Sequence, residues 1–279
     1  MTVAHAMVAL AATLWGMWPL VLAKAGSVSS SFQGLFVMFF MTVFAFPFLR
    51  WDRNPGKKSR RAWAGVVWLG IADSLNLLFL FRAYQLTSVA IAVLTHYLAP
   101  ILIAVASPWV LREKMSSRAK VAVALSFTGI FVVLSPWSHS PTRGDLLGAT
   151  FGAMSAVCYA SNVLVQKKIG NEFTGTELMA YHSWFGLPIF LFLSPFAVPV
   201  PWQACAWLLL GALVMGTLGG MLFLFGLKRI PANHAATLTL LEPLVAVVAG
   251  GVFLHQPLSP NVWLGGSLVL LGSWQVIRS

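Results

Sequence analysis

The chain has 279 residues, of which 58% are hydrophobic and 9% charged, and its mean hydropathy is +0.82. Soluble domains carry roughly 25% charged residues, so this composition excludes a water-soluble globule. The net charge of +11 comes from basic residues in short loops, which indicates membrane topology rather than a nucleic-acid partner. The apolar stretches run for about 20 residues without the alternation of barrel strands, so they predict transmembrane helices in a lipid bilayer.

Ten helices are expected in chain order. They cover roughly residues 3–23, 31–49, 62–84, 89–111, 118–135, 145–166, 176–197, 203–227, 232–254 and 260–277. The first stretch contains Ala23-Lys24-Ala25, which is similar to a signal-peptide cleavage site. Residues 1–5 carry no Lys or Arg, however, and this stretch has a partner in the second half of the chain. We therefore expect it to be a retained transmembrane helix.

The two halves of the chain are similar to each other. Residues 11–24 (AATLWGMWPLVLAK) align with residues 155–168 (SAVCYASNVLVQKK) at an offset of 144, which also aligns the LFLF at 78–81 with that at 222–225. After an indel near residue 93, an offset of 143 matches Pro100 with Pro243, Ser116 with Ser259 and Gly129 with Gly272. Five crossings per copy would invert the second copy. The sequence thus predicts an all-α membrane protein with two inverted five-helix repeats, 1–143 and 144–279, around a central cavity.

Charge predicts the orientation. With the N-terminus in the cytoplasm, 15 of the 18 Lys and Arg residues fall in inside loops, and only Lys24, Arg82 and Arg143 fall outside. The positive-inside rule therefore predicts that both termini are cytoplasmic. The expected location is the plasma membrane, most simply a bacterial inner membrane.

Several motifs resemble a known family. In the first half they are Trp15-Gly16 with Pro19, the segment from Ser88 to Pro100, which ends in Tyr97-Leu98-Ala99-Pro100, and Leu111-Arg112-Glu113. The second half repeats part of this pattern at Pro243 and Gly272. Nearly the whole chain resembles the ten-helix EamA-like branch of the drug/metabolite transporter superfamily, and within it the amino-acid and aromatic amino-acid exporters. Two positions depart from that pattern: His255-Gln256 stands where the family often has Glu, and Ala99 where aromatic amino-acid exporters can carry a bulkier residue. The resemblance implies a secondary transporter with a central substrate cavity and alternating access.

Polar residues deep in membrane helices are costly, so each is a candidate functional residue. Asp73 and Glu242 are the acids at mid-helix positions. Glu242 precedes Pro243, and could meet a substrate ammonium, move a proton, or form an interhelical hydrogen bond. Asp73 and Asn76 share a helix face, and could line the cavity or join an interhelical network.

Aromatic residues complete the predicted substrate site. The offset of 144 relates Trp15 to Tyr159 and Trp18 to Asn162, so a pseudo-two-fold axis would place both pairs around one space, unless the aromatics only fill a helix interface. Tyr97 lies on the family motif, whereas His96 points about 100° away around the helix and suits an interhelical hydrogen bond. His182 is a further candidate, although a lone histidine suits a satisfied bundle residue. Helix breaks are expected at Pro19, Pro100 and Pro243.

Alternative functions follow from the same residues. The favoured function is export of amino acids, aromatic and other apolar ones first, and related small metabolites, either passive or coupled to protons. A multidrug carrier would need a deep acid in an aromatic cage, and a nucleotide-sugar carrier would need deep basic residues. A membrane-embedded enzyme would need a catalytic pair such as Glu242 with His96 or His182. The sequence has no H-E-x-x-H, P-loop or G-x-S-x-G motif, so neither enzymatic activity, metal nor cofactor is expected.

Overall fold

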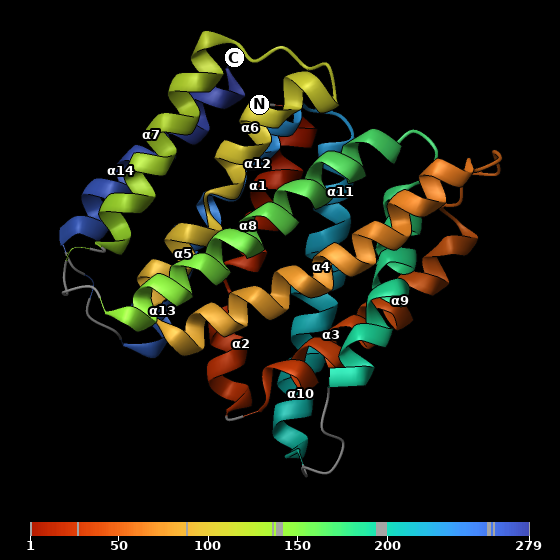
Figure 1. Ribbon diagram of the computed structural model, residues 1–279, viewed down its shortest axis with the longest axis horizontal. Coiled ribbons are helices and arrows are strands. Elements are labelled where there is room, and N and C mark those ends of the chain that lie inside the picture. Colours follow the sequence, from red (N-terminus) through yellow and green to blue (C-terminus); the bar gives the residue numbers. More distant parts are fainter. Residues whose placement is uncertain are drawn as a thin grey trace.

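The computed structural model describes residues 2–26, 28–87, 89–135, 137, 142–193, 200–255, 258 and 260–278. The described elements are helical (Figure 1). They are α1 (Val3–Trp15), α2 (Trp18–Ala25), α3 (Ser30–Ala45), η1 (Phe46–Arg50), α4 (Arg60–Leu86), α5 (Val89–His96), α6 (Ala99–Val110), α7 (Ser117–Leu134), α8 (Arg143–Ile169), α9 (Gly175–Leu193), α10 (Trp202–Gly211), η3 (Ala212–Gly219), α11 (Gly220–Leu227), α12 (Ala232–Thr239), α13 (Leu241–Leu254) and α14 (Pro260–Ile277).

Eight segments of the described chain are long and apolar enough to cross a membrane. They are Val3–Ala25, Ser31–Arg50, Arg60–Leu80, Ile91–Val110, Ser117–Leu134, Arg143–Ile169, Trp202–Leu227 and Ala232–Leu254. The other two predicted spans correspond to α9 and α14, which are helical but do not belong to these eight. The end of the predicted seventh helix, at 194–197, lies outside the described residues. The chain is therefore an integral membrane protein, and its ten-span inverted arrangement stays a prediction.

Local sequence explains where the helices begin. The side chains of Ser59, Ser116 and Thr142 accept hydrogen bonds from the first-turn amides of α4, α7 and α8. At α8, Asp145 completes a capping box with Thr142. These caps satisfy amides that would otherwise lack partners inside the helix.

Three spans are interrupted close to a proline. The first span breaks at Gly16 and Met17, so that Pro19 lies in the first turn of α2. Pro100 lies in the first turn of α6, after the break that follows α5. Pro243 likewise lies in the first turn of α13, after a break at Leu240. Proline has no backbone N–H to continue a helix, which explains why each new helix begins one or two residues before it.

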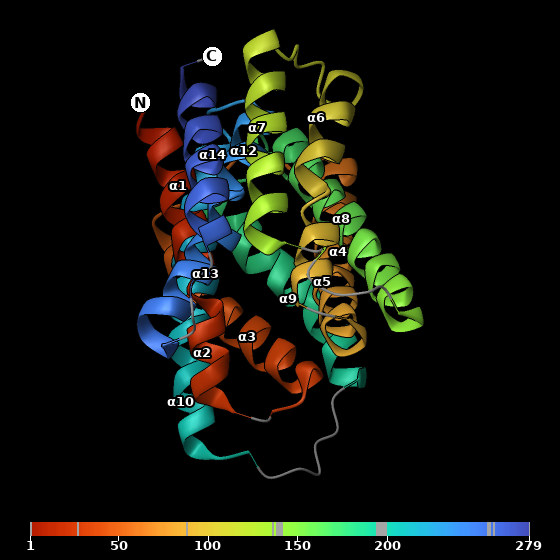
Figure 2. The same cartoon turned by 90° about the vertical axis from the view of Figure 1, so that its left-hand side faces the viewer.

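The helices pack in long pairs. α7 and α14 lie side by side in two perpendicular views (Figures 1 and 2). α8 crosses alongside α4, which also packs against α9. A core of small and branched residues joins α1, α6, α7, α8, α11, α12 and α14. Large apolar side chains on the outside, including Phe192 at 91% exposure and Trp109 at 77%, suit contact with lipid.

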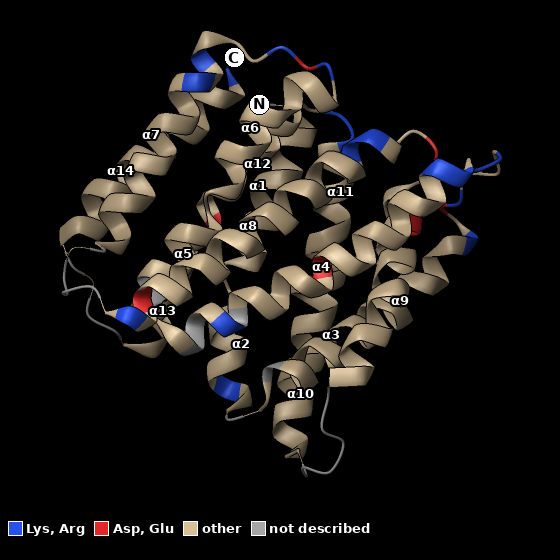
Figure 3. Ribbon diagram, in the orientation of Figure 1, with Lys and Arg blue, Asp and Glu red and all other residues tan. Residues whose placement is uncertain are grey.

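Charge is concentrated at one end of the bundle. Figure 3 shows most Lys and Arg residues near the starts of α4 and α7 and the ends of α8, α11 and α14, on the side where both chain termini lie. Few basic residues occupy the opposite end, near α2, α5 and α13. This asymmetry is the pattern that the positive-inside rule associates with the cytoplasmic face.

Candidate functional site

A polar cluster joins three helices near the middle of the bundle. Asp73 is the central residue of α4, and its Oδ1 accepts a hydrogen bond of 3.3 Å from the Asn162 amide of α8. Its Oδ2 lies 3.5 Å from Nε2 of His182 on α9. The Asp73 side chain keeps 25% of its surface exposed, whereas that of His182 keeps 7%. The cluster therefore presents a carboxylate that is held from two sides and is still accessible.

A hydrogen-bond partner determines that one of the two ring nitrogens of His182 carries a proton. Its Nδ1 lies 2.8 Å from the carbonyl oxygen of Leu178, one turn earlier in α9. A carbonyl oxygen only accepts hydrogen bonds, so Nδ1 must carry a proton. The nitrogen that faces Asp73 is therefore Nε2 of an Nδ1-protonated ring. On the other side of Asp73, the buried Oδ1 of Asn162 has no hydrogen-bond partner among the described residues.

Asn76 belongs to a different network from Asp73. Ser155 of α8 donates a hydrogen bond of 2.7 Å to Oδ1 of Asn76, and Ser155 Oγ lies 2.8 Å from Nδ1 of His96. The hydroxyl has one proton, so His96 donates to it. This series of hydrogen bonds links α5, α8 and α4, and it directs Asn76 toward α8. His96 therefore forms the interhelical hydrogen bond that the sequence predicts for it.

Two tyrosines approach Glu242 from different helices. Tyr97, in the break between α5 and α6, interacts with the Glu242 side chain at the start of α13. Tyr159 of α8 interacts with Thr239 and lies near both Glu242 and Asp73. The His96 ring lies between the tyrosines, with its centroid 5.1 Å from that of Tyr97 and 5.5 Å from that of Tyr159. Interrupted helices thus bring an acid and three aromatic rings together.

Trp15 and Trp18 have a different environment. The indole N–H of Trp15 donates to the carbonyl oxygen of Met215 at 3.0 Å, and its ring packs 5.1 Å from that of Phe223. Trp18 packs against Gly211. Both tryptophans therefore contribute to the interface of α1 and α2 with α10, η3 and α11.

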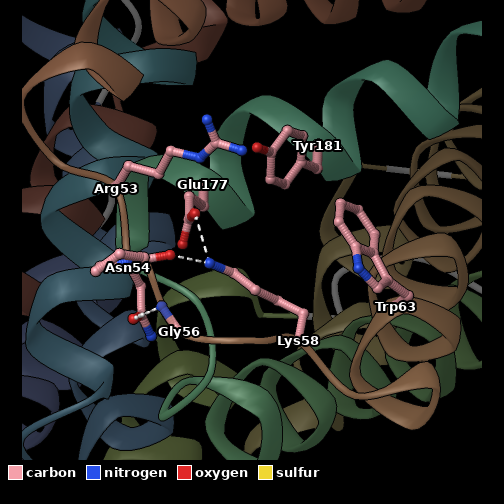
Figure 4. Close-up of a pocket in the computed structure, with 8 residues that line it drawn as sticks. Arg53, Asn54, Gly56, Lys58, Trp63, Glu177 and Tyr181 are labelled. Carbon is pink, nitrogen blue, oxygen red and sulfur yellow. Dashed lines mark hydrogen bonds and ion pairs between the residues drawn. The ribbon is translucent and has the colours of Figure 1, made fainter.

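A separate pocket lies at an end of the bundle. It has a volume of about 280 Å³ and is lined by Arg53, Asn54, Pro55, Gly56, Lys58, Trp63, Glu177 and Tyr181. Figure 4 shows Lys58 pointing to Glu177, with which it forms an ion pair of 3.0 Å, while Arg53 extends toward Tyr181. The pocket is formed by the loop before α4, the first turn of α4 and the first two turns of α9. It contains none of the central polar residues, so we take the residues around Asp73 and Glu242 as the candidate functional site.

Comparison with known proteins now decides the family. A model of the EamA-like transporter family matches residues 2–135 and again residues 146–278. The chain belongs to the EamA-like transporter family. These two matches fall in the two halves that contain the duplicated motifs, and the family is part of the drug/metabolite transporter superfamily.

Relatives of this EamA-like transporter are also transporters. An uncharacterized transporter from Archaeoglobus fulgidus is 25% identical over 276 residues, which cover 96% of this chain and 94% of that one. The uncharacterized transporter YwfM from Bacillus subtilis is 28% identical over 203 residues, which cover 69% of this chain and 66% of that one. A solved crystal structure shares the fold, with a TM-score of 0.83, 16% identity and 98% of both chains covered. Family and relatives indicate transport, not enzymatic activity.

The structure adds residues that sequence reasoning missed. In the sequence, Ser155 is only the first residue of a repeated segment, whereas in the structure it connects Asn76 to His96. Lys167 was assigned to a cytoplasmic loop, but its Nζ donates to the carbonyl oxygen of Leu227 at 2.9 Å and lies 3.5 Å from Glu113. The sequence offers one signal for the contact with Glu113, because this residue belongs to the Leu111-Arg112-Glu113 motif. His255 ends α13 in a left-handed conformation, and Gln256 lies outside the described residues.

Proposed function

We propose that this EamA-like transporter exports amino acids, aromatic and other apolar ones first, and related small metabolites from the cytoplasm by alternating access. The observation that carries the proposal is the accessible Asp73 carboxylate, held by Asn162 and His182 at the centre of the bundle. A half-buried anion with accessible surface suits an ammonium group, because a charge in low dielectric needs a partner. Tyr97 and Tyr159 supply amphipathic aromatic surface for an apolar side chain.

The proposed architecture is two inverted five-helix repeats, 1–143 and 144–279, with Pro19, Pro100 and Pro243 at the helix breaks. The double match of the family model and the three interrupted spans support it. In such transporters, broken helices line the substrate site near the midplane. Both termini are proposed to be cytoplasmic in a bacterial inner membrane, which the charge asymmetry of Figure 3 supports.

Counterflow in proteoliposomes tests the proposal. Vesicles with the purified full-length chain, loaded with unlabelled amino acid, should take up the same amino acid in radiolabelled form faster than protein-free vesicles. Competition by a panel of amino acids should rank phenylalanine, tyrosine and leucine above acidic ones. Absence of exchange for every amino acid in the panel would overturn the proposed substrate class.

A second candidate is export of aromatic organic cations. Glu242 lies beside Tyr97 and near Tyr159, with the His96 ring between them, which is the acid-plus-aromatic environment that such a cation needs. Tetraphenylphosphonium, which has a charge but no N–H donor, separates the candidates. Its exchange without exchange of amino acids would favour this second function.

A further inference from the structure

We propose that Asp73, Asn162 and His182 form one cation site that holds either a proton or the ammonium group of the substrate, so that substrate leaves in exchange for a proton. This inference rests on the proposed function and deepens it, because it names the coupling ion and the substrate group that competes with it. It assigns coupling to the contact between α4, α8 and α9 rather than to Glu242.

The first argument concerns the proton. Nδ1 of His182 is already committed to the carbonyl oxygen of Leu178 at 2.8 Å. Nε2 faces Oδ2 of Asp73 at 3.5 Å. If neither atom carried a proton, a nitrogen lone pair would face a carboxylate oxygen, and the two would repel each other. A single proton on either atom makes the contact attractive. The observed geometry therefore suits a pair that shares one proton.

The second argument concerns the ammonium group. Asn162 is 3% exposed, and its amide nitrogen is used on Asp73, which leaves its carbonyl oxygen buried without a partner among the described residues. An unpaired buried acceptor carries a free-energy cost. An ammonium group has three donors and a positive charge, so it can satisfy Asn162 Oδ1 and the Asp73 carboxylate together. Tyr159 lies one turn earlier on α8 and close to Asp73, where its ring can contact the substrate.

The two cations exclude each other because the site contains one carboxylate. When the ammonium group donates to Asp73, the proton shared with His182 leaves to water, and His182 remains neutral with its Nδ1–H on Leu178. When the substrate leaves, a proton from the opposite compartment restores the pair. Two positive charges beside one buried carboxylate would repel in low dielectric. For a zwitterionic amino acid, each cycle carries the substrate outward and one positive charge inward.

No other titratable group in the described structure takes over this role. α8 contributes Cys158 and Tyr159 near Asp73. α5 contributes His96, which donates to Ser155. α3 and α11, which pack against α9, contain no titratable side chain. On α9 itself, Glu177 is paired with Lys58 at the helix start. Glu242 of α13 interacts with Tyr97 and lies near Tyr159.

The experiment uses proteoliposomes with full-length protein and two readouts. Counterflow of tritiated L-phenylalanine without a gradient measures exchange, and accumulation driven by an imposed pH gradient measures coupling. His182→Gln should keep counterflow and lose accumulation. Asn162→Ala should weaken phenylalanine binding about tenfold, through the lost acceptor, and keep the gradient response. Asp73→Asn should lose both, with folding checked by circular dichroism and gel filtration.

Controls separate coupling from a general loss of activity. His5→Gln changes a buried histidine at the start of α1, whose ring contacts Thr2 and His234, and should retain both readouts. A potassium diffusion potential should drive accumulation in the parent, because the exchange moves net charge. A parent that exchanges phenylalanine but ignores the pH gradient would overturn the inference and leave the proposed function standing. So would a His182→Gln variant that still accumulates phenylalanine.

If the parent exchanges no amino acid, the proposed function fails and the proton site is decided separately. Nitrogen-15 spectra of histidine-labelled protein in nanodiscs report which ring nitrogens carry protons, and the His182 signal is assigned by its loss in His182→Gln. Protons on both nitrogens at mildly acid pH, reduced to one by Asp73→Asn, would support the shared proton. An Nε2 without a proton, unchanged in Asp73→Asn, would overturn it.

Discussion

Glu113 and Lys167 connect the two halves of the chain at the end that carries both termini. Their side chains form an ion pair of 3.5 Å between the α6–α7 connection and the last turn of α8. Glu113 also accepts a hydrogen bond of 2.8 Å from the amide of Ala232 at the start of α12. Pro231 precedes α12 and offers no side-chain cap, so Glu113 supplies the acceptor that this helix start lacks. The arrangement links the α6–α7 connection to the end of α8 and to the start of α12.

Lys167→Met should therefore destabilise the folded protein. The change removes the donor of the Leu227 carbonyl oxygen and leaves Glu113 without its cation. We expect a loss of about 1 kcal/mol in unfolding free energy, because the hydrogen bond and ion pair that are lost are partly buried and charged. Thermal unfolding in detergent measures it. Lys168→Met, at the exposed neighbouring position, is the matched control and should unfold like the parent.

The second prediction concerns stability and follows from the close packing of α7 on α14. A Cβ placed on Gly129 would lie 2.6 Å from the carbonyl oxygen of Gly265. Real side chains do not approach backbone this closely, so Gly129→Ala should push the helices apart and cost about 1–3 kcal/mol. Ser267→Leu adds more volume to α14 but at an exposed position, and should leave the melting temperature unchanged. Equal stability of both variants would show that the helices do not contact at Gly129.

Cysteine labelling checks the orientation. With Cys158 and Cys205 replaced by alanine, a cysteine at Lys57 should resist an impermeant thiol reagent in intact cells, and a cysteine at Trp137 should react. The expectation follows from the excess of basic residues at the end that includes residues 50–61. Permeabilised cells, in which both positions should react, provide the control. Labelling at Lys57 alone in intact cells would reverse the topology.

Helix positions could be predicted from sequence because bilayer thickness dictates the length of an apolar segment. The predicted 62–84 and 118–135, for example, correspond to Arg60–Leu86 and Ser117–Leu134. Partners across helices could not be predicted, because periodicity gives a face and not the neighbour that meets it. The spacing predicts that Asp73 and Asn76 share a helix face, but the contacts of Asp73 with Asn162 and His182 depend on how α4, α8 and α9 cross.

Trp15 shows the same limit in more detail. Its repeat relation to Tyr159 leaves two environments open, a wall of the central cavity or a helix interface, and its indole donates to the Met215 carbonyl oxygen within η3. η3 is a π-helix, in which hydrogen bonds skip one residue further than in an α-helix and carbonyl oxygens become available to side chains. The apolar sequence of residues 212–219 does not indicate a π-helix, so the repeat alone could not predict the hydrogen-bond partner of Trp15.

The tyrosines should contribute to substrate affinity through their hydroxyl groups and rings. Tyr97→Phe removes the hydroxyl that interacts with Glu242, and Tyr159→Phe the one that interacts with Thr239. Each should weaken phenylalanine exchange by about 1 kcal/mol, roughly fivefold in apparent affinity. Tyr181→Phe, which changes a tyrosine of the separate end pocket, is the matched control. If Tyr97→Ala and Tyr159→Ala both exchange substrate like the parent, the binding site lies elsewhere.

Glu242→Gln distinguishes the two acids at the centre of the bundle. Both could bind a cation, but they differ in their surroundings: Asp73 faces a histidine that can share its proton, whereas Glu242 faces the neutral hydroxyl of Tyr97. The Tyr97 hydroxyl stays neutral near neutral pH, so Glu242 has no second titratable group in this contact with which to share a proton. Glu242→Gln keeps the size of the side chain and removes its charge. We expect this variant to exchange phenylalanine more weakly and still to accumulate it in response to an imposed pH gradient. Its affinity for tetraphenylphosphonium, measured by equilibrium dialysis, should fall more than its affinity for phenylalanine. Loss of the gradient response in Glu242→Gln, with counterflow intact and His182→Gln still coupled, would move the proton site from α4 and α9 to α13.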